Sequence, residues 1–174
     1  MMKKLFLSCF LATGTFFLSA GVLVDNGKSA YTLVHAGGRS QYCAEFLQEM
    51  LFHGTKVKLP VLHEKDFKGG TPAIFIGATR AAQERKLLPA SYARWEHRID
   101  IEKERVFLTG SDSPGVSVER SEFESGTFKA VITFLERFCD SCFFAPASRK
   151  EYIAKQQKIT LPDHFSYRRK PVIQ

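Results

Sequence analysis

The stretch from Gly126 to Pro146, GTFKAVITFLERFCDSCFFAP, constrains the fold of this chain more than any other. Its apolar residues recur at i, i+3, i+4 and i+7, the spacing that places side chains on one face of a helix. They are Val131, Phe134, Leu135 and Phe138, and Phe128 and Ile132 widen the same face. Phe143-Phe144 follows and is closed by Pro146, a pattern typical of a brief buried strand. The stretch therefore predicts a helix over residues 127–138 and a strand after it.

Other apolar runs predict the strands of one mixed sheet. Val22–Val24 and Tyr31–Val34 flank Asn26-Gly27, a dipeptide that favours a hairpin turn. Ala73–Gly77 is nearly unbroken in apolar character, so we expect it to be the central strand, covered on both faces. Two further runs alternate apolar and charged residues and predict a second hairpin with one covered face. They are Arg98–Ile101 and Arg105–Thr109.

A second amphipathic stripe predicts a helix over residues 40–53. Its apolar residues are Cys43, Phe46, Leu47, Met50 and Leu51. Ser40 is the expected N-cap and Gly54 the expected stop. Val57–Leu62, interrupted by Pro60, is expected to be an edge strand, and Thr79–Leu88 a more polar helix. The sequence thus predicts an α/β (α+β) domain, a mixed sheet with hairpins packed against two main helices. A ferredoxin-like split sheet is the alternative.

Several short motifs resemble the N-terminal domain of alpha-glucuronidases, a domain that also precedes many other bacterial glycoside hydrolases. The matching words are Gly126-Thr127, Ala130-Val131, Phe134-Leu135-Glu136 and Phe144-Ala145-Pro146. The opening strand, Asn-Gly-Lys turn, strand and small-residue loop Ala36–Gly38 also match. The resemblance implies a beta-hexosaminidase domain 2-like fold.

The chain departs from the family pattern in two places. Cys139–Cys142 replaces a Gly-Cys-Arg-like turn. The family's Gly-Gly-Asp-x-x-Gly turn stands directly before its Gly-Thr helix start, whereas here Val116–Ser125 lies between Gly110–Gly115 and that start. We expect this charged insertion to be a mobile loop.

The resemblance covers Val22 to Pro171 and implies a carbohydrate context rather than catalysis by this chain. In the family this domain precedes a TIM-type barrel, which needs about 250 residues. The implied function is a non-catalytic accessory domain of an exported glycoside hydrolase system, a truncated or split relative of an alpha-glucuronidase-like enzyme. Its partner would be a separately encoded barrel or a carbohydrate. A free-standing carbohydrate- or protein-binding module is the alternative.

Residues 1–20 have the pattern of a secretory signal peptide. Lys3 and Lys4 precede an apolar run from Leu5 to Leu18, and small residues follow. The run is shorter than a membrane span needs. We therefore expect an exported, periplasmic or extracellular protein that meets the membrane only through this signal, with one domain over residues 21–162.

The net charge of +7 does not indicate nucleic-acid binding, since no recognised nucleic-acid motif accompanies it. Basic residues gather towards the C-terminus, and a solvated basic face explains them. They are Arg149, Lys150, Lys155, Lys158, Arg168, Arg169 and Lys170.

Cys43, Cys139 and Cys142 are candidate structural thiols in the exported chain. Cys139-x-x-Cys142 would be a redox motif if it opened a helix, but it closes one, where the helix dipole disfavours a thiolate. A small redox enzyme is therefore the weakest hypothesis. A bridge between Cys43 and Cys139 is left open.

No pattern predicts catalytic, cofactor-binding or metal-binding residues. No nucleophile elbow is present, Gly37-Gly38 lacks the Lys-Ser/Thr of a phosphate loop, and His53 and His63 have no partners at ligand spacing. The acids that a glycosidase pair would need fall in hairpins and loops, where solubility explains them. They are Asp100, Glu102, Glu104, Glu119, Glu122 and Glu124.

Residues 163–174 correspond to the family's linker into the barrel, and their apolar residues are too few to predict a helix or strand. We expect Phe165 and Tyr167 to form an interface, either between copies of the chain or with a separately encoded barrel.

Overall fold

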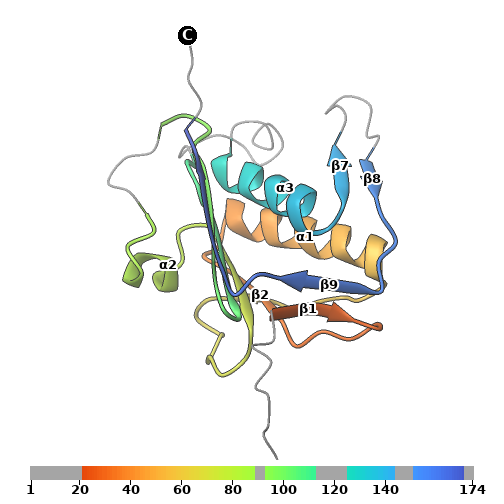
Figure 1. The fold of residues 1–174 in the computed structure, drawn as a ribbon. Coiled ribbons are helices and arrows are strands. Elements are labelled where there is room, and N and C mark those ends of the chain that lie inside the picture. Colours follow the sequence, from red (N-terminus) through yellow and green to blue (C-terminus); the bar gives the residue numbers. More distant parts are fainter. Residues whose placement is uncertain (1–20, 89–92, 113–124, 144–150, 171–174) are drawn as a thin grey trace, which may run out of the picture.

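A mixed six-stranded sheet organises the fold (Figure 1). The computed structural model describes residues 21–88, 93–112, 125–143 and 151–170. The elements are β1 Gly21–Asp25, β2 Thr32–His35, α1 Arg39–Thr55, β3 Val61–His63, β4 Ala73–Ile76, α2 Arg80–Glu84, β5 His97–Glu102, β6 Arg105–Gly110, α3 Gly126–Phe138, β7 Ser141–Phe143, β8 Glu151–Ile153, β9 Lys158–Leu161 and β10 His164–Arg169. The expected signal peptide over 1–20 and the expected loop, apart from Ser125, lie outside the described residues.

The strand order in the sheet is β3-β2-β4-β6-β5-β10. β3, β2, β4 and β6 run parallel, whereas β5 and β10 continue the sheet with antiparallel pairing. β4 lies between β2 and β6, which confirms the prediction for Ala73–Gly77, and β5 and β6 form the predicted second hairpin. The mixed α/β class is also confirmed.

Helices α1 and α3 lie side by side on one face of the sheet, and α2 lies on the other (Figure 1). Alternation along each strand divides the core accordingly. Ile74 and Ile76 of β4 join the cluster under α1 and α3, whereas Phe75 joins the smaller cluster with Phe107 and Ala82. Both apolar helix stripes face the core, because Phe134 is fully buried and Phe46 is partly buried and packs against the same cluster.

The Asn26-Gly27 hairpin prediction is wrong. The chain turns at Asp25–Lys28, but β1 then pairs with β9, and β2 pairs with β3 and β4. All four residues of β2 are buried, so this strand is covered on both faces in the sheet interior and takes a partner on each side.

The ends of three predicted elements also differ. Gly38, not Ser40, is the N-cap of α1, because the Ser40 hydroxyl donates to the Gly37 carbonyl instead. The helix passes Gly54 and ends where Lys56 adopts a left-handed conformation. α2 has five residues, and Leu87 beyond it packs into the second core cluster. The strand after α3 begins at Ser141, and Phe144 lies outside the described residues.

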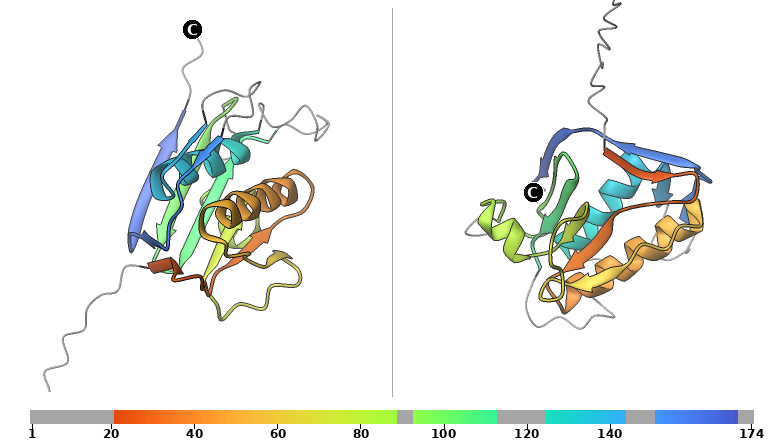
Figure 2. Two further views of the ribbon diagram at one scale, coloured as in Figure 1. Left: turned by 90° about the vertical axis from the view of Figure 1, so that its right-hand side faces the viewer. Right: turned by 90° about the horizontal axis from the view of Figure 1, so that it is seen from below.

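Residues 164–169 form a strand, which the sequence analysis did not predict. β10 pairs with β5 from His164 opposite Glu102 to Arg169 opposite His97. Figure 2 shows β10 along the outer edge of the sheet. Phe165 and Tyr167 alternate along it and pack against the main core, so two aromatic residues suffice for an edge strand.

Candidate functional site

The start of α3 is built by three residues that are separated along the chain. Asp112 accepts hydrogen bonds through Oδ1 from the Ser125 hydroxyl, at 2.6 Å, and from the Thr127 amide, at 3.2 Å. Its Oδ2 accepts from the Thr127 hydroxyl at 2.6 Å. Ser125 is the N-cap and accepts from the Phe128 amide. The carboxylate therefore occupies the end of the helix where an anion is most favourable.

Two glycines allow the strand-to-helix junction to close. A Cβ on Gly110 would lie 2.0 Å from the Gly126 carbonyl carbon. A Cβ on Gly126 would lie 2.3 Å from the backbone carbonyl oxygen of Glu96 and 2.3 Å from the backbone nitrogen of Ser111. The Gly126 amide donates to the Ser111 carbonyl at 2.7 Å. Backbone touches backbone here, so only glycine fits at either position.

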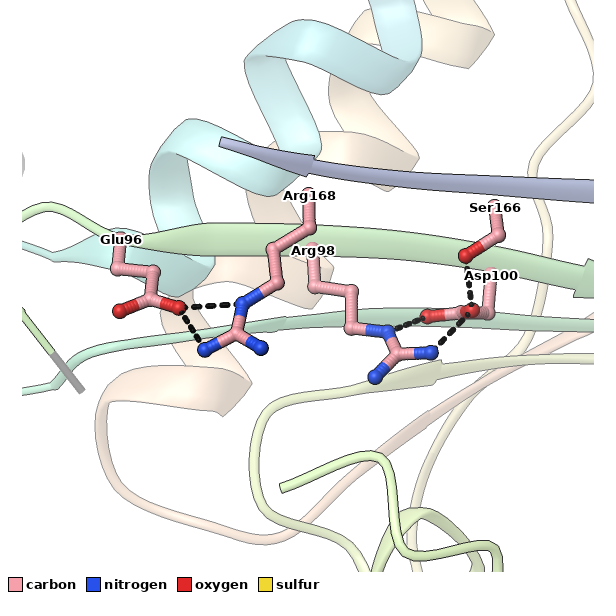
Figure 3. Close-up of polar contacts among 5 residues, drawn as sticks. All are labelled: Glu96, Arg98, Asp100, Ser166 and Arg168. Atoms are coloured by element: carbon pink, nitrogen blue, oxygen red, sulfur yellow. Dashed lines mark hydrogen bonds and ion pairs between the residues drawn. The ribbon is translucent and has the colours of Figure 1, made fainter. Parts of the chain in front are cut away.

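Buried carboxylates hold two arginines on the face of β5 and β10 that points away from α3 (Figure 3). Glu96 is 1% exposed and accepts from the Arg168 guanidinium and from the Ala93 amide. Asp100 is 5% exposed, forms a bidentate pair with Arg98 and accepts from the Ser166 hydroxyl at 2.8 Å. Figure 3 shows these five side chains on one face, which we call the arginine face.

The carboxylates of the arginine face do not form an acid and base pair. Burial alone would raise the pKa of Glu96, but the Ala93 amide and the Arg168 guanidinium outweigh it and hold that pKa below its usual value. A glycosidase general acid needs the opposite shift. Asp100 and Glu102 are also ion-paired, with Arg98 and Arg85. Among the sequence candidates, Glu119, Glu122 and Glu124 lie outside the described residues.

Glu96 was not a candidate in the sequence, because its partner Arg168 is distant along the chain and no local pattern marks the pair. Asp112 carried a weak signal, because it lies in the turn cluster Gly110–Gly115.

The cysteines lie where a redox site is disfavoured. Cys139 caps the C-terminus of α3, as the sequence predicted, and burial followed by the charge of Asp140 raises its pKa to about 12. Burial also raises the pKa of Cys43 to about 12, with Asp112 next in effect. Both thiols and the exposed thiol of Cys142 are free. Thiolates, which carry the redox chemistry, are thus suppressed at the two buried positions.

The cavity beside Cys139 is too small for a cofactor. It has a volume of about 10 Å³ and lies between the C-terminal halves of α1 and α3 and strand β9. This is about the space of one water molecule.

His35 and His63 meet at the carboxyl ends of β2 and β3, whereas His53 is exposed on α1. Within the described ranges no three metal-binding side chains gather. None of the helices in those ranges has the length and apolar character of a membrane span.

Phe165 and Tyr167 contact α3 of their own chain. The Phe165 ring lies 5.2 Å from that of Phe138, and the Arg137 guanidinium lies 4.1 Å from the Tyr167 ring. Both aromatic side chains stay partly exposed. Their role as an interface stays a prediction.

No protein-family model matches the chain, and no curated protein matches it.

Proposed function

We propose that this chain is a non-catalytic accessory domain of an exported glycoside hydrolase system and acts beside a separately encoded catalytic barrel. The observation that carries the proposal is the junction at the start of α3. The residues that match the alpha-glucuronidase N-terminal domain, Asp112 and Gly126-Thr127, are in direct contact there. Residues 113–125 separate Asp112 from Gly126 in the sequence, yet the Asp112 carboxylate accepts hydrogen bonds from the amide and the hydroxyl of Thr127.

The chemistry of the described carboxylates supports a non-catalytic role. Glu96, Asp100 and Glu102 each pair with an arginine, which favours fixed structural charges over proton transfer. On the side of the sheet that carries α2, an apolar cluster lies under the helix, and the arginine face is the polar part of that side, on β5 and β10. Arg168 and Ser166 are exposed on it. A polar, partly exposed sheet face suits contact with another protein or a glycan.

A turnover assay separates the accessory role from an enzyme. The purified chain is incubated with p-nitrophenyl glycosides and with glucuronoxylan oligosaccharides, alone and with an alpha-glucuronidase barrel expressed without its own N-terminal domain. We expect no hydrolysis by the chain alone, and a higher activity or thermal stability of the barrel when the chain is added. Hydrolysis by the chain alone would refute the proposal.

Two controls distinguish the remaining hypotheses. Binding on a glycan array with no effect on the barrel would favour the free-standing module. Reduction of a disulfide substrate that is lost in Cys139→Ser would favour the redox enzyme, against the raised pKa of that thiol.

A further inference from the structure

Two histidine rings accept hydrogen bonds from the loops at the carboxyl ends of β2 and β3. His35 and His63 stand opposite each other in the parallel register, and their rings meet edge to face with centroids 5.3 Å apart. The Gly37 amide donates to Nδ1 of His35 at 3.0 Å, and the Lys65 amide donates to Nδ1 of His63 at 3.1 Å. Each ring thus closes the loop that follows its own strand.

These bonds fix the protonation state of both rings. A nitrogen that accepts from a backbone amide carries no proton, so the neutral rings hold their proton on Nε2. A second proton would have to bind at Nδ1, where it would convert the acceptor into a donor facing another donor. Metal binding at Nε2 is disfavoured for the same reason, since Nε2 carries the remaining proton.

His35 has a neighbouring strand on each side and two acidic groups nearby. β3 places His63 against it, and β4 places Ile76, which carries no charge, on the opposite side. Glu45 of α1 and Glu64, which follows β3, are the acidic groups that act on it. Burial, and then His63, lowers the pKa of His35, and the two glutamates oppose this shift. His35 as a whole is 6% exposed.

The two loops also connect to two helices that begin at this edge, α1 and α2. Gly37, with φ of 94°, leads into the N-cap of α1, and a Cβ there would lie 3.3 Å from Nε2 of His63. Glu64 donates its amide to the His35 carbonyl at 2.9 Å, and its carboxylate accepts from the Arg80 amide at the start of α2. A change at the histidines therefore reaches the starts of α1 and α2.

We propose that His35 and His63 form an acid-sensitive latch: proton uptake by His35 releases the Gly37 amide and opens the loop that joins β2 to α1, while the sheet stays folded. Because the folded protein binds this proton less readily than the unfolded chain, the latch stabilises the fold above the ordinary pKa of histidine. That contribution is lost as the pH falls through the lowered value. The latch does not depend on the proposed function.

Nuclear magnetic resonance of the purified protein tests the latch. At about pH 7.5 we expect the ring nitrogens of both histidines to show the Nε2–H form, and the Gly37 amide to be protected from hydrogen exchange. As the pH is lowered stepwise through the lowered pKa of His35, we expect its ring to become cationic and Gly37 to lose its protection factor, which corrects for the intrinsic pH dependence of exchange. Amides of β4 and β6 should stay protected.

Two variants separate the latch from general acid sensitivity. In His35→Asn the amide oxygen can replace Nδ1 as acceptor but does not titrate, so Gly37 should stay protected over the same pH range. His53→Asn, an exposed position on α1, should behave as the unmodified protein does. A proton on Nδ1 of His35 at neutral pH would overturn the proposal even if no variant folds. Protection of Gly37 that survives acid in the unmodified protein, or is lost equally in His35→Asn, would also overturn it.

Discussion

Gly110 and Gly126 are important because neither carries a side chain. The backbone at the end of β6 therefore lies directly against the backbone at the start of α3. Asp112 then supplies the charge that the first turn of α3 otherwise lacks, since no acidic residue lies in that turn. The junction between β6 and α3 therefore depends on Gly110, Gly126 and Asp112.

Gly126→Ala should therefore destabilise the protein by about 3 kcal/mol or more, because its Cβ would overlap backbone atoms that cannot move aside. Denaturant unfolding measures this loss. Gly69→Ala is the matched control. Its Cβ meets nothing within 4 Å, and its φ of 80° should cost only about 1–2 kcal/mol. Equal losses in the two variants would refute the close-approach argument.

The three described cysteines should differ sharply in reactivity. At mildly alkaline pH, iodoacetamide should modify Cys142 in the folded protein, because that thiol is exposed. Cys43 and Cys139 should react only after unfolding, since burial raises the pKa of each to about 12. Mass spectrometry of the modified peptides gives the order of reaction. Fast modification of Cys139 in the folded state would revive the redox hypothesis.

Strand β10 shows where local sequence patterns stop being informative. The helices were predictable because the apolar residues of α1 and α3 recur with the helical period within a single segment. β4 was predictable because its apolar run is continuous. The partners of β1 and β10 were not, because β9 and β5 lie far along the chain and only tertiary packing selects them.

The ion pair between β10 and the segment before β5 should contribute to stability. Arg168→Met keeps the apolar stem but leaves the Glu96 carboxylate buried without its cation, which should cost about 1–2 kcal/mol at neutral pH because Arg168 is half exposed. The folded pKa of Glu96 is lowered, so its contribution exists above the unfolded pKa and is lost as the pH falls through the folded value.

In Arg168→Met the loss of stability on acidification should be smaller than in the unmodified protein, because Arg168 contributes to the lowered pKa of Glu96 and hence to the stability that acid removes. Denaturant unfolding between about pH 7 and about pH 3 measures it. Lys158→Met, which removes an exposed cation on β9, is the control and should leave the profile unchanged. Identical profiles for both variants would show that the pair makes no contribution.

At the scale of the whole molecule, the two faces of the sheet have different roles. α1 and α3 seal one face, whereas the arginine face leaves charged groups partly exposed beside α2 (Figures 1 and 3). The α/β class followed from local patterns. The Glu96–Arg168 pair of the arginine face did not, because these two residues become neighbours only when β10 joins β5.

The interface prediction for β10 belongs to this scale. Phe165→Ser and Tyr167→Ser together should weaken self-association or barrel binding, but Phe165 also contacts Phe138, so the double variant should lose stability as well. Tyr167→Ala separates the effects better, since it leaves the contact between Phe165 and Phe138 in place. Light scattering measures association, and His164→Ala on the same strand is the control. Association that is unchanged in both tyrosine variants would exclude Tyr167 from an interface.

Sedimentation velocity tests the accessory role most directly. The purified chain is mixed with an alpha-glucuronidase barrel expressed without its own N-terminal domain, at increasing micromolar concentrations. The proposal predicts a faster-sedimenting complex of chain and barrel whose amount rises with concentration. Two components that sediment independently over the whole range, with no hydrolysis by the chain, would contradict it.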